Sequence, residues 1–228
     1  MFQKRHLPFI LIIAVAVGTG VAGTLFYRAK VAESARAQSA AEVLHIAPGT
    51  KPGAVPPHIR GRGQVIIEEF ADFQCPPCGT VATILHQLEE EYRGRLRIVF
   101  RHFPLDGHQH ARLAARSAEA AGVQGKFWEM HDLIYQHRTI WSTETDARPH
   151  FTRFAETLGL DVVRFTADLD SPEVAARVAA DQERGHSVKV SSTPTIFLND
   201  QPVPPASFSP PGFRTLIDAA LAAPTPAP

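Results

Sequence analysis

The apolar positions between residues 65 and 103 predict a β-α-β unit. Residues 65–70 form a short apolar run with β-branched side chains, which is typical of a buried strand. Residues 76–92 carry apolar side chains at helical spacing, which predicts a helix with one buried stripe. The residues of this stripe are Val81, Ile84, Leu85, Leu88 and Tyr92. Residues 95–103 alternate between apolar and polar positions, as a second strand does.

The rest of the pattern is helical and then returns to strand. From about residue 107 to 189, apolar residues recur at helical spacing, which predicts a block of several helices. Residues 193–200 predict a strand that ends in a turn, and residues 201–205 supply the other arm of a hairpin. Residues 209–222 predict a closing helix, and we expect the proline-rich tail, 223–228, to be disordered.

An apolar segment near the N-terminus predicts that residues 1–27 are a cytoplasmic stub followed by a single-pass membrane anchor. Residues 7–27 carry no charge, and these 21 residues match the roughly 20 that a transmembrane helix needs. A cleaved secretory signal is the alternative, with a cleavage site at residues 35–37. Either interpretation places the remaining chain on the periplasmic or extracellular side. Residues 28–62 then predict a flexible linker to a domain at 63–222.

The composition is that of a folded domain and indicates no charged ligand. Hydrophobic residues make up 44% and charged residues 20% of the chain, so a core of ordinary size can form. Lysine plus arginine number 23, as do aspartate plus glutamate, which gives a formal net charge of zero. Because there is no basic excess, nucleic acid is not an expected partner. The function therefore has to be sought in local motifs.

The chain contains two cysteines, Cys75 and Cys78, separated by Pro76 and Pro77. Such a pair serves a metal site, a structural disulfide or a redox centre. A zinc site needs about four ligands and the pair supplies two, while a disulfide across so short a loop constrains little chain entropy. For a redox centre there is a physical reason, because proline favours the first helical position and so puts Cys75 at the N-cap. The helix dipole stabilises a thiolate there. We therefore expect Cys75 to be the exposed nucleophile and Cys78 the thiol that resolves a mixed disulfide.

Two further features near the cysteines have open interpretations. Asp72 either tunes the cysteine pair by its charge or caps the turn before the helix. Four histidines occur in the following segments, and we assign none of them a role. They are His102, His108, His110 and His131.

Four motifs resemble, in order and spacing, the DsbA-like thioredoxin-fold family of thiol-disulfide oxidoreductases. They are EEFADFQCPPC, RHFPL, QGKFWEMHDLIY and SSTPTIFLND. The resemblance implies a thioredoxin-like α/β fold, in which a central mixed sheet is interrupted by a helical insertion at about 107–189. It also implies a cis bond between Thr193 and Pro194 beside Cys75, where the partner protein binds. Glu69, six residues before the first cysteine, would be buried beneath the cysteine pair and move a proton to or from Cys78. The alternatives are that Glu69 is a solvated strand residue and that the neighbouring Glu68 takes this role.

The chain departs from DsbA between the cysteines, where DsbA has Pro-His and this sequence has Pro76-Pro77. Pro77 supplies neither an imidazole nor a backbone N–H, so we expect a less stabilised Cys75 thiolate and a weaker oxidant.

These features together predict a membrane-tethered, extracytoplasmic thiol-disulfide oxidoreductase that supports disulfide bond formation. Its expected partners are cysteine-containing extracytoplasmic proteins and a membrane protein that recycles the Cys75–Cys78 pair. No metal or organic cofactor is expected besides that redox-active disulfide. A reductase or isomerase is the alternative within the same class, and a copper-handling protein that uses the dithiol as soft ligands is the alternative outside it.

Overall fold

The computed structural model describes residue 30 and residues 58–223. The predicted anchor, most of the predicted linker and the last five residues lie outside this part of the chain. Among the described residues, no helix combines the length and the apolar character that crossing a membrane requires.

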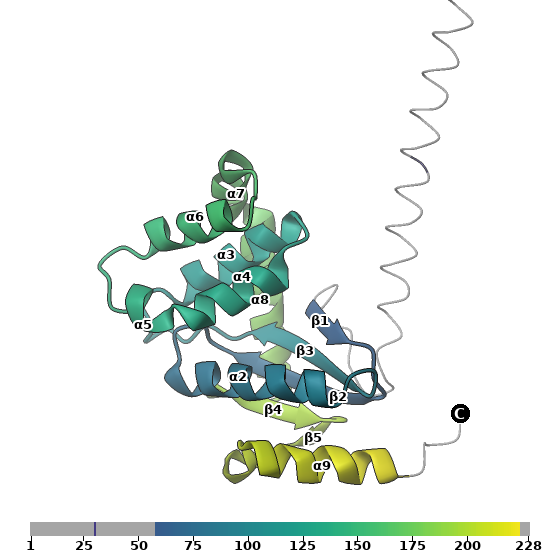
Figure 1. Cartoon of the computed structure of the whole chain (residues 1–228). Coiled ribbons are helices and arrows are strands. Elements are labelled where there is room, and N and C mark those ends of the chain that lie inside the picture. The colour runs from purple at the N-terminus through teal and green to yellow at the C-terminus, as the bar shows by residue number, and fades with distance from the viewer. Residues whose placement is uncertain (1–29, 31–57, 224–228) are drawn as a thin grey trace, which may run out of the picture. The chain divides into compact units, whose positions relative to one another are not determined.

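A five-stranded mixed sheet forms the centre of the domain (Figure 1). In spatial order its strands are β1 (His58–Gly61), β3 (Leu96–His102), β2 (Val65–Ala71), β4 (Thr195–Leu198) and β5 (Gln201–Pro202). β2 and β3 are parallel, and the other neighbouring strands are antiparallel. Every residue of β2 is buried, as expected of a central strand that is covered on both faces.

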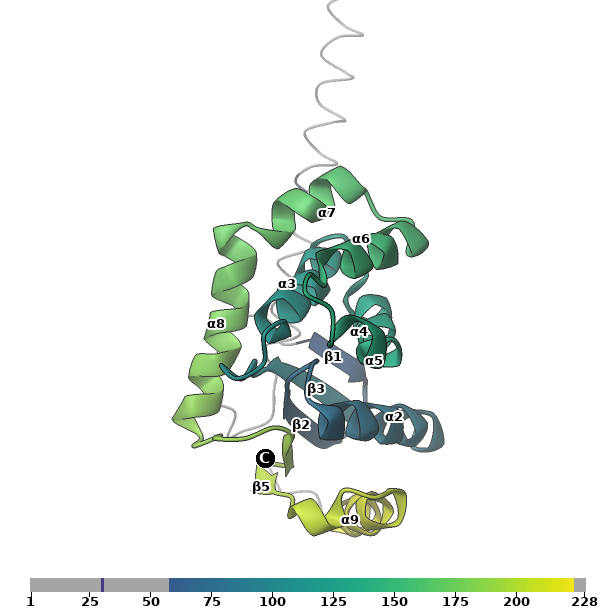
Figure 2. The same cartoon turned by 90° about the vertical axis from the view of Figure 1, so that its left-hand side faces the viewer.

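Helices cover both faces of this sheet, as Figure 2 shows for α2 (Pro76–Glu91) and α8 (Pro172–Ser187), which lie on opposite sides. The closing helix, α9 (Pro210–Ala222), packs on the same face as α2. The remaining helices are α3 (Ala111–Val123), α4 (Phe127–Gln136), α5 (Arg138–Trp141), α6 (Arg148–Thr157), α7 (Val162–Leu169) and the short η1 (Pro205–Ser207). The predicted α/β fold with an inserted helical block is therefore confirmed.

Local sequence explains how several of these elements begin and turn. α8 and α9 each begin with proline after a serine, and the serine side chain accepts a hydrogen bond from the backbone N–H three residues later. The hairpin between β4 and β5 turns at Asn199 and Asp200, whose φ angles are 45° and 64°. Positive φ at both central residues is the geometry of the tightest β-hairpins, and Asn and Asp tolerate it.

β1 corrects the predicted linker, which was expected to continue to residue 62. His58–Gly61 instead pair with β3, with His58 opposite Phe100. The His58 Nε2 atom lies 2.9 Å from Glu119 Oε1 in α3, and Arg60 donates to Asp132 in α4 at 2.7 Å. Because these partners are remote in sequence, the proline- and glycine-rich local pattern contains no sign of the strand.

Candidate active site

The strand order brings the cysteine pair and the segment Thr193–Pro194 to the same edge of the sheet. β4 is antiparallel to β2 with Thr195 opposite Phe70, so the chain enters β4 where it leaves β2. The peptide bond between Thr193 and Pro194 is cis, which confirms the prediction for this bond. The Cys75 thiol donates to the Thr193 carbonyl oxygen across an Sγ–O distance of 3.4 Å.

Cys75 is the N-cap residue of α2, as predicted, and Cys78 lies in the first turn of that helix. Both cysteines are free thiols in this structure. We expected Cys75 to be exposed, but only 5% of its surface is accessible. It is still more accessible than Cys78, which is 0% exposed. The contact with Thr193 accounts for part of this burial, and it arises from the sheet topology rather than from the helix.

The environment lowers the Cys75 pKa to about 6, from an ordinary value of 9.0. A hydrogen bond from the Cys78 thiol contributes most, and the Thr193 side chain and the Cys78 backbone N–H also stabilise the thiolate. Burial and the negative charge of Asp72 act in the opposite direction. The Thr193 hydroxyl is buried without a partner in the described structure, so it is available to donate to a charged sulfur.

Cys78 has the opposite character, because burial raises its pKa above the ordinary value. The hydrogen bond to Cys75 and the nearby Glu69 raise it further. The two thiols at the start of α2 thus differ in acidity, with Cys75 the stronger acid. This asymmetry suits an attacking thiolate and a resolving thiol that stays protonated until it is needed.

Glu69 and Glu68 lie on opposite faces of β2, because successive side chains of a strand alternate. Glu69 is 1% exposed, and its Oε1 atom has no hydrogen-bond partner among the described residues. Burial raises its pKa to about 8, with a smaller contribution from Cys75. The interpretation of Glu69 as a solvated strand residue is therefore excluded, and its carboxyl is electrostatically coupled to both cysteines.

Glu68 belongs to a buried ion-pair network on the other face of the sheet. Its carboxylate accepts from Arg101 Nε at 2.9 Å and from Arg184 Nη2 at 3.2 Å. Arg101 also donates to Asp181 of α8 at 3.0 Å. The network joins α8 to β2 and β3, and it separates Glu68 from the cysteine site.

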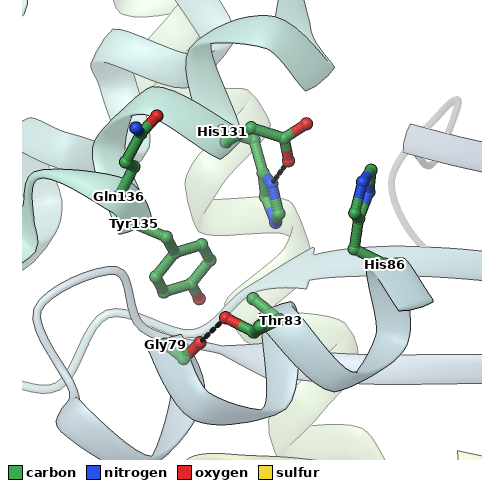
Figure 3. A pocket seen from close by; sticks show the side chains of 8 residues that line it. Gly79, Thr83, His86, His131, Tyr135 and Gln136 are labelled. Atoms are coloured by element: carbon green, nitrogen blue, oxygen red, sulfur yellow. Dashed lines mark hydrogen bonds and ion pairs between the residues drawn. The ribbon is translucent and has the colours of Figure 1, made fainter. Parts of the chain in front are cut away.

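Two adjoining pockets lie along the outer side of α2, between this helix and the inserted helices α4 and α5. The first has a volume of about 270 Å³ and lies between α2 and α4. Figure 3 shows His131 and Tyr135 of α4 projecting across it toward Gly79 and Thr83 of α2. The second, of about 410 Å³, extends the hollow to Pro76 and Arg138.

Tyr135 is a residue of this site that was not singled out from the sequence, although it ends the motif QGKFWEMHDLIY. Its hydroxyl is buried without a partner in the described part of the chain. Burial raises its pKa, and the nearby Cys78 and Glu69 raise it further. An isolated tyrosine in a helix carries no local signal for such a position.

The two prolines between the cysteines occupy the first two helical positions of α2, and both are exposed. They therefore remain accessible at the edge of the site. The described residues also include a cluster whose ligand atoms are close enough for a metal ion, formed by His58, His102 and Glu119. In it, one oxygen of Glu119 lies within hydrogen-bonding distance of both imidazoles, and the cysteines are not members of this cluster.

A family model described as thioredoxin matches residues 60–219. The solved structure of a thioredoxin-like oxidoreductase from Silicibacter pomeroyi is 27% identical, with a TM-score of 0.62, and the match covers 74% of this chain and 94% of that one. The thiol-disulfide exchange protein alpha-DsbA2 from Wolbachia pipientis is 18% identical, with a TM-score of 0.63 and coverages of 85% and 98%. At that identity the second likeness concerns the fold alone.

A curated relative carries a different description. The Na(+)/H(+) antiporter NhaA 3 of Salinispora tropica is 38% identical over 197 residues, which are 82% of this chain. The chain spans only 29% of the antiporter's length, so the match concerns one portion of that protein. The family match, the helical block within the sheet fold and the paired cysteines agree with one another. The chain belongs to the thioredoxin family.

Proposed function

We propose that the protein exchanges disulfides with cysteine-bearing proteins outside the cytoplasm and so supports disulfide bond formation. The observation that carries the proposal is the acidity difference between the thiols. Cys75 has a lowered pKa at the N-cap of α2 and contacts Thr193, whereas Cys78 is fully buried with a raised pKa. The pair itself is the redox group, and the proposal requires no other cofactor.

In the oxidising direction, a substrate thiolate attacks Cys75 of the Cys75–Cys78 disulfide. The bond between the two cysteines breaks, a mixed disulfide forms at Cys75, and the electron pair passes to Cys78. Glu69 is protonated near neutral pH because its pKa is about 8, so it can supply the proton that Cys78 takes up. A second substrate thiolate then attacks the substrate sulfur of the mixed disulfide. This step forms the substrate disulfide and releases Cys75 as a thiolate.

The segment Thr193–Pro194 is proposed to hold the substrate chain beside Cys75. Thr193 offers its backbone next to the sulfur, together with a buried hydroxyl that has no partner within residues 58–223. An extended polypeptide that lies against this segment would place its own cysteine within reach of Cys75. The hollow along α2 that reaches Pro76 leaves room for further parts of the partner.

The proposed location is the outer side of the cell membrane, with residues 7–27 as the anchor. The apolar character of these 21 residues supports it. A solved structure of similar fold from Salmonella enterica serovar Typhimurium is described as a periplasmic thioredoxin-like protein. The antiporter relative carries a matching portion within a protein named for transport across a membrane. We propose a membrane redox protein as the partner that recycles the pair, and we do not extend ion transport to this chain.

The function is tested by adding the oxidised full-length protein, in detergent, to a reduced unfolded protein that needs disulfides. We expect disulfides to form in the substrate faster than in the buffer alone, while the Cys75–Cys78 pair becomes reduced. A variant with Cys75→Ser should show only the background rate. The proposal fails if the wild-type protein also shows only that background.

The reduction potential of the Cys75–Cys78 pair decides whether the protein oxidises or reduces its partners. We expect Pro77→His to change this potential. The substitution restores a backbone N–H in the first turn and adds an imidazole near Cys75, so it should lower the Cys75 pKa. Each tenfold gain in thiolate stability makes this two-electron couple about 30 mV more oxidising. The measurement is equilibration of both proteins against glutathione. An unchanged or more reducing couple would show that the intervening prolines do not set the potential.

A further inference from the structure

The Asp72 carboxylate is fully buried at the start of the loop that carries the cysteines, with an exposed side-chain fraction of 0%. Its Oδ1 atom accepts from the Gln74 backbone N–H at 2.7 Å. Its Oδ2 atom accepts from the Leu105 backbone N–H at 2.9 Å and lies 2.7 Å from His108 Nδ1. A carboxylate with three such partners is held in one position.

This position is close to the attacking sulfur. The Asp72 backbone carbonyl accepts the Cys75 N–H at 3.1 Å, so the two residues share one tight turn. The negative charge of Asp72 raises the Cys75 pKa, against the hydrogen bonds that lower it. The sequence leaves two roles open for Asp72, and the structure is consistent with both. Its side chain caps the turn, and its charge acts on the Cys75 thiol.

His108 reaches this carboxylate from the loop between β3 and α3. Its side chain is 28% exposed, so one side of the imidazole faces solvent while Nδ1 faces Asp72. Other ionisable groups of that loop are directed elsewhere. Asp106 pairs with Arg112 at the surface, and His110 Nε2 contacts the Glu144 carbonyl oxygen. Within the described part of the chain, His108 is the ionisable side chain recorded in contact with the Asp72 carboxylate.

We propose that Asp72 and His108 form a positioning pair that sets the oxidising strength of the Cys75–Cys78 couple. Asp72 opposes the Cys75 thiolate, and the N–H group of His108 offsets part of the carboxylate charge. DsbA has a histidine between its cysteines, whereas this chain has two prolines there. In the proposed pair, the imidazole of His108 comes from another loop and acts on Cys75 through Asp72. This inference rests on the proposed function, because it concerns the potential of the same pair.

The two substitutions are expected to act in opposite directions. Asp72→Asn removes the charge, so the Cys75 pKa should fall by about one unit, since neighbouring charges shift pKa values by 1–3 units. A tenfold gain in thiolate stability makes the couple about 30 mV more oxidising. His108→Leu leaves the carboxylate without its partner, so the Cys75 pKa should rise and the couple should become more reducing. His108→Gln keeps an N–H donor and should stay closer to the wild type.

The test is a double-mutant cycle on the full-length chain, read by thiolate absorbance and by equilibration against glutathione. In the Asp72→Asn background, His108→Leu should have no further effect on the Cys75 pKa or the potential. Asp106→Asn is the matched control, because it removes an exposed charge from the same loop as His108 and should change neither quantity. Thermal unfolding of each oxidised variant shows whether the loop is intact, and a folding defect would not produce shifts of opposite sign.

Two outcomes separate this inference from the proposed function. If the wild-type pair exchanges disulfides but the single substitutions leave the potential unchanged, or shift it in the same direction, the inference is overturned and the function stands. If His108→Leu has the same effect with and without Asp72, the histidine does not act through the carboxylate, and the inference is likewise overturned. A wild-type pair without thiol exchange would instead refute the proposed function.

Discussion

Glu69→Gln is expected to stabilise the oxidised protein in mildly alkaline solution, whereas Glu68→Gln should destabilise it. The two residues are adjacent in β2, but Glu69 Oε1 has no hydrogen-bond partner among the described residues, whereas Glu68 is bound by two arginines. Removing one partner of a buried ion pair costs about 3–5 kcal/mol, because the remaining charge is uncompensated. Glu68→Gln should therefore lower the free energy of unfolding by an amount of this order.

The effect of Glu69→Gln should depend on pH. The folded protein holds the Glu69 pKa at about 8, above the ordinary value of 4.5, so the native state binds a proton that the unfolded chain releases. Stability is therefore lost as the pH rises from about 4.5 to about 8, by about 1.4 kcal/mol per unit at most. Glutamine does not ionise, so the variant should lack this loss and gain on the wild type as the pH rises.

The measurement is urea unfolding of both oxidised variants and the wild type at several pH values between about 4 and 9. The oxidised form is used because it removes the charge of Cys75, while burial, the main cause of the Glu69 pKa, remains. The difference between Glu69→Gln and the wild type isolates this one group from all others that titrate. A difference independent of pH would show that Glu69 ionises in the folded protein as it does in water.

Cys78→Ser and Cys78→Ala should both trap mixed disulfides between Cys75 and partner proteins, because neither can resolve them. Their rates of trapping should differ. The hydrogen bond from Cys78 is the main reason for the low Cys75 pKa, and serine keeps an O–H donor at that position while alanine does not. At about neutral pH the serine variant should hold Cys75 as thiolate, whereas in the alanine variant the Cys75 pKa should move toward its ordinary value.

These variants are compared by alkylation of Cys75 over a range of pH and by non-reducing electrophoresis with a cysteine-bearing partner. We expect half-maximal alkylation near pH 6 for the wild type and the serine variant, and at higher pH for the alanine variant. Cys75→Ser supplies the reciprocal control and should form no mixed disulfide through Cys78, which is fully buried. Trapping through Cys78 instead of Cys75 would reverse the assigned roles.

Sequence reasoning was sufficient for the strands and helices that have a strong local pattern. The bounds of α2 and β2 are close to those predicted. The prediction of α2 rested on its apolar stripe and first-turn prolines, and that of β2 on its buried apolar run. The position of Cys75 at the N-cap also followed from local rules, because proline favours the first turn of a helix. β1 did not follow, since its partners in β3, α3 and α4 are remote in sequence and its own residues show no strand pattern.

The candidate site shows the same division. The sequence alone determined the cysteine pair, their order along the helix and the helix dipole that favours a thiolate at Cys75. Only the tertiary structure decided how far Cys75 is covered, because Thr193 reaches it through the pairing of β4 with β2. It also decided between Glu68 and Glu69, since their burial and partners depend on which helix covers each face of the sheet. His108 contacts Asp72 for the same reason, because a charge in a folded protein acts through space and not along the chain.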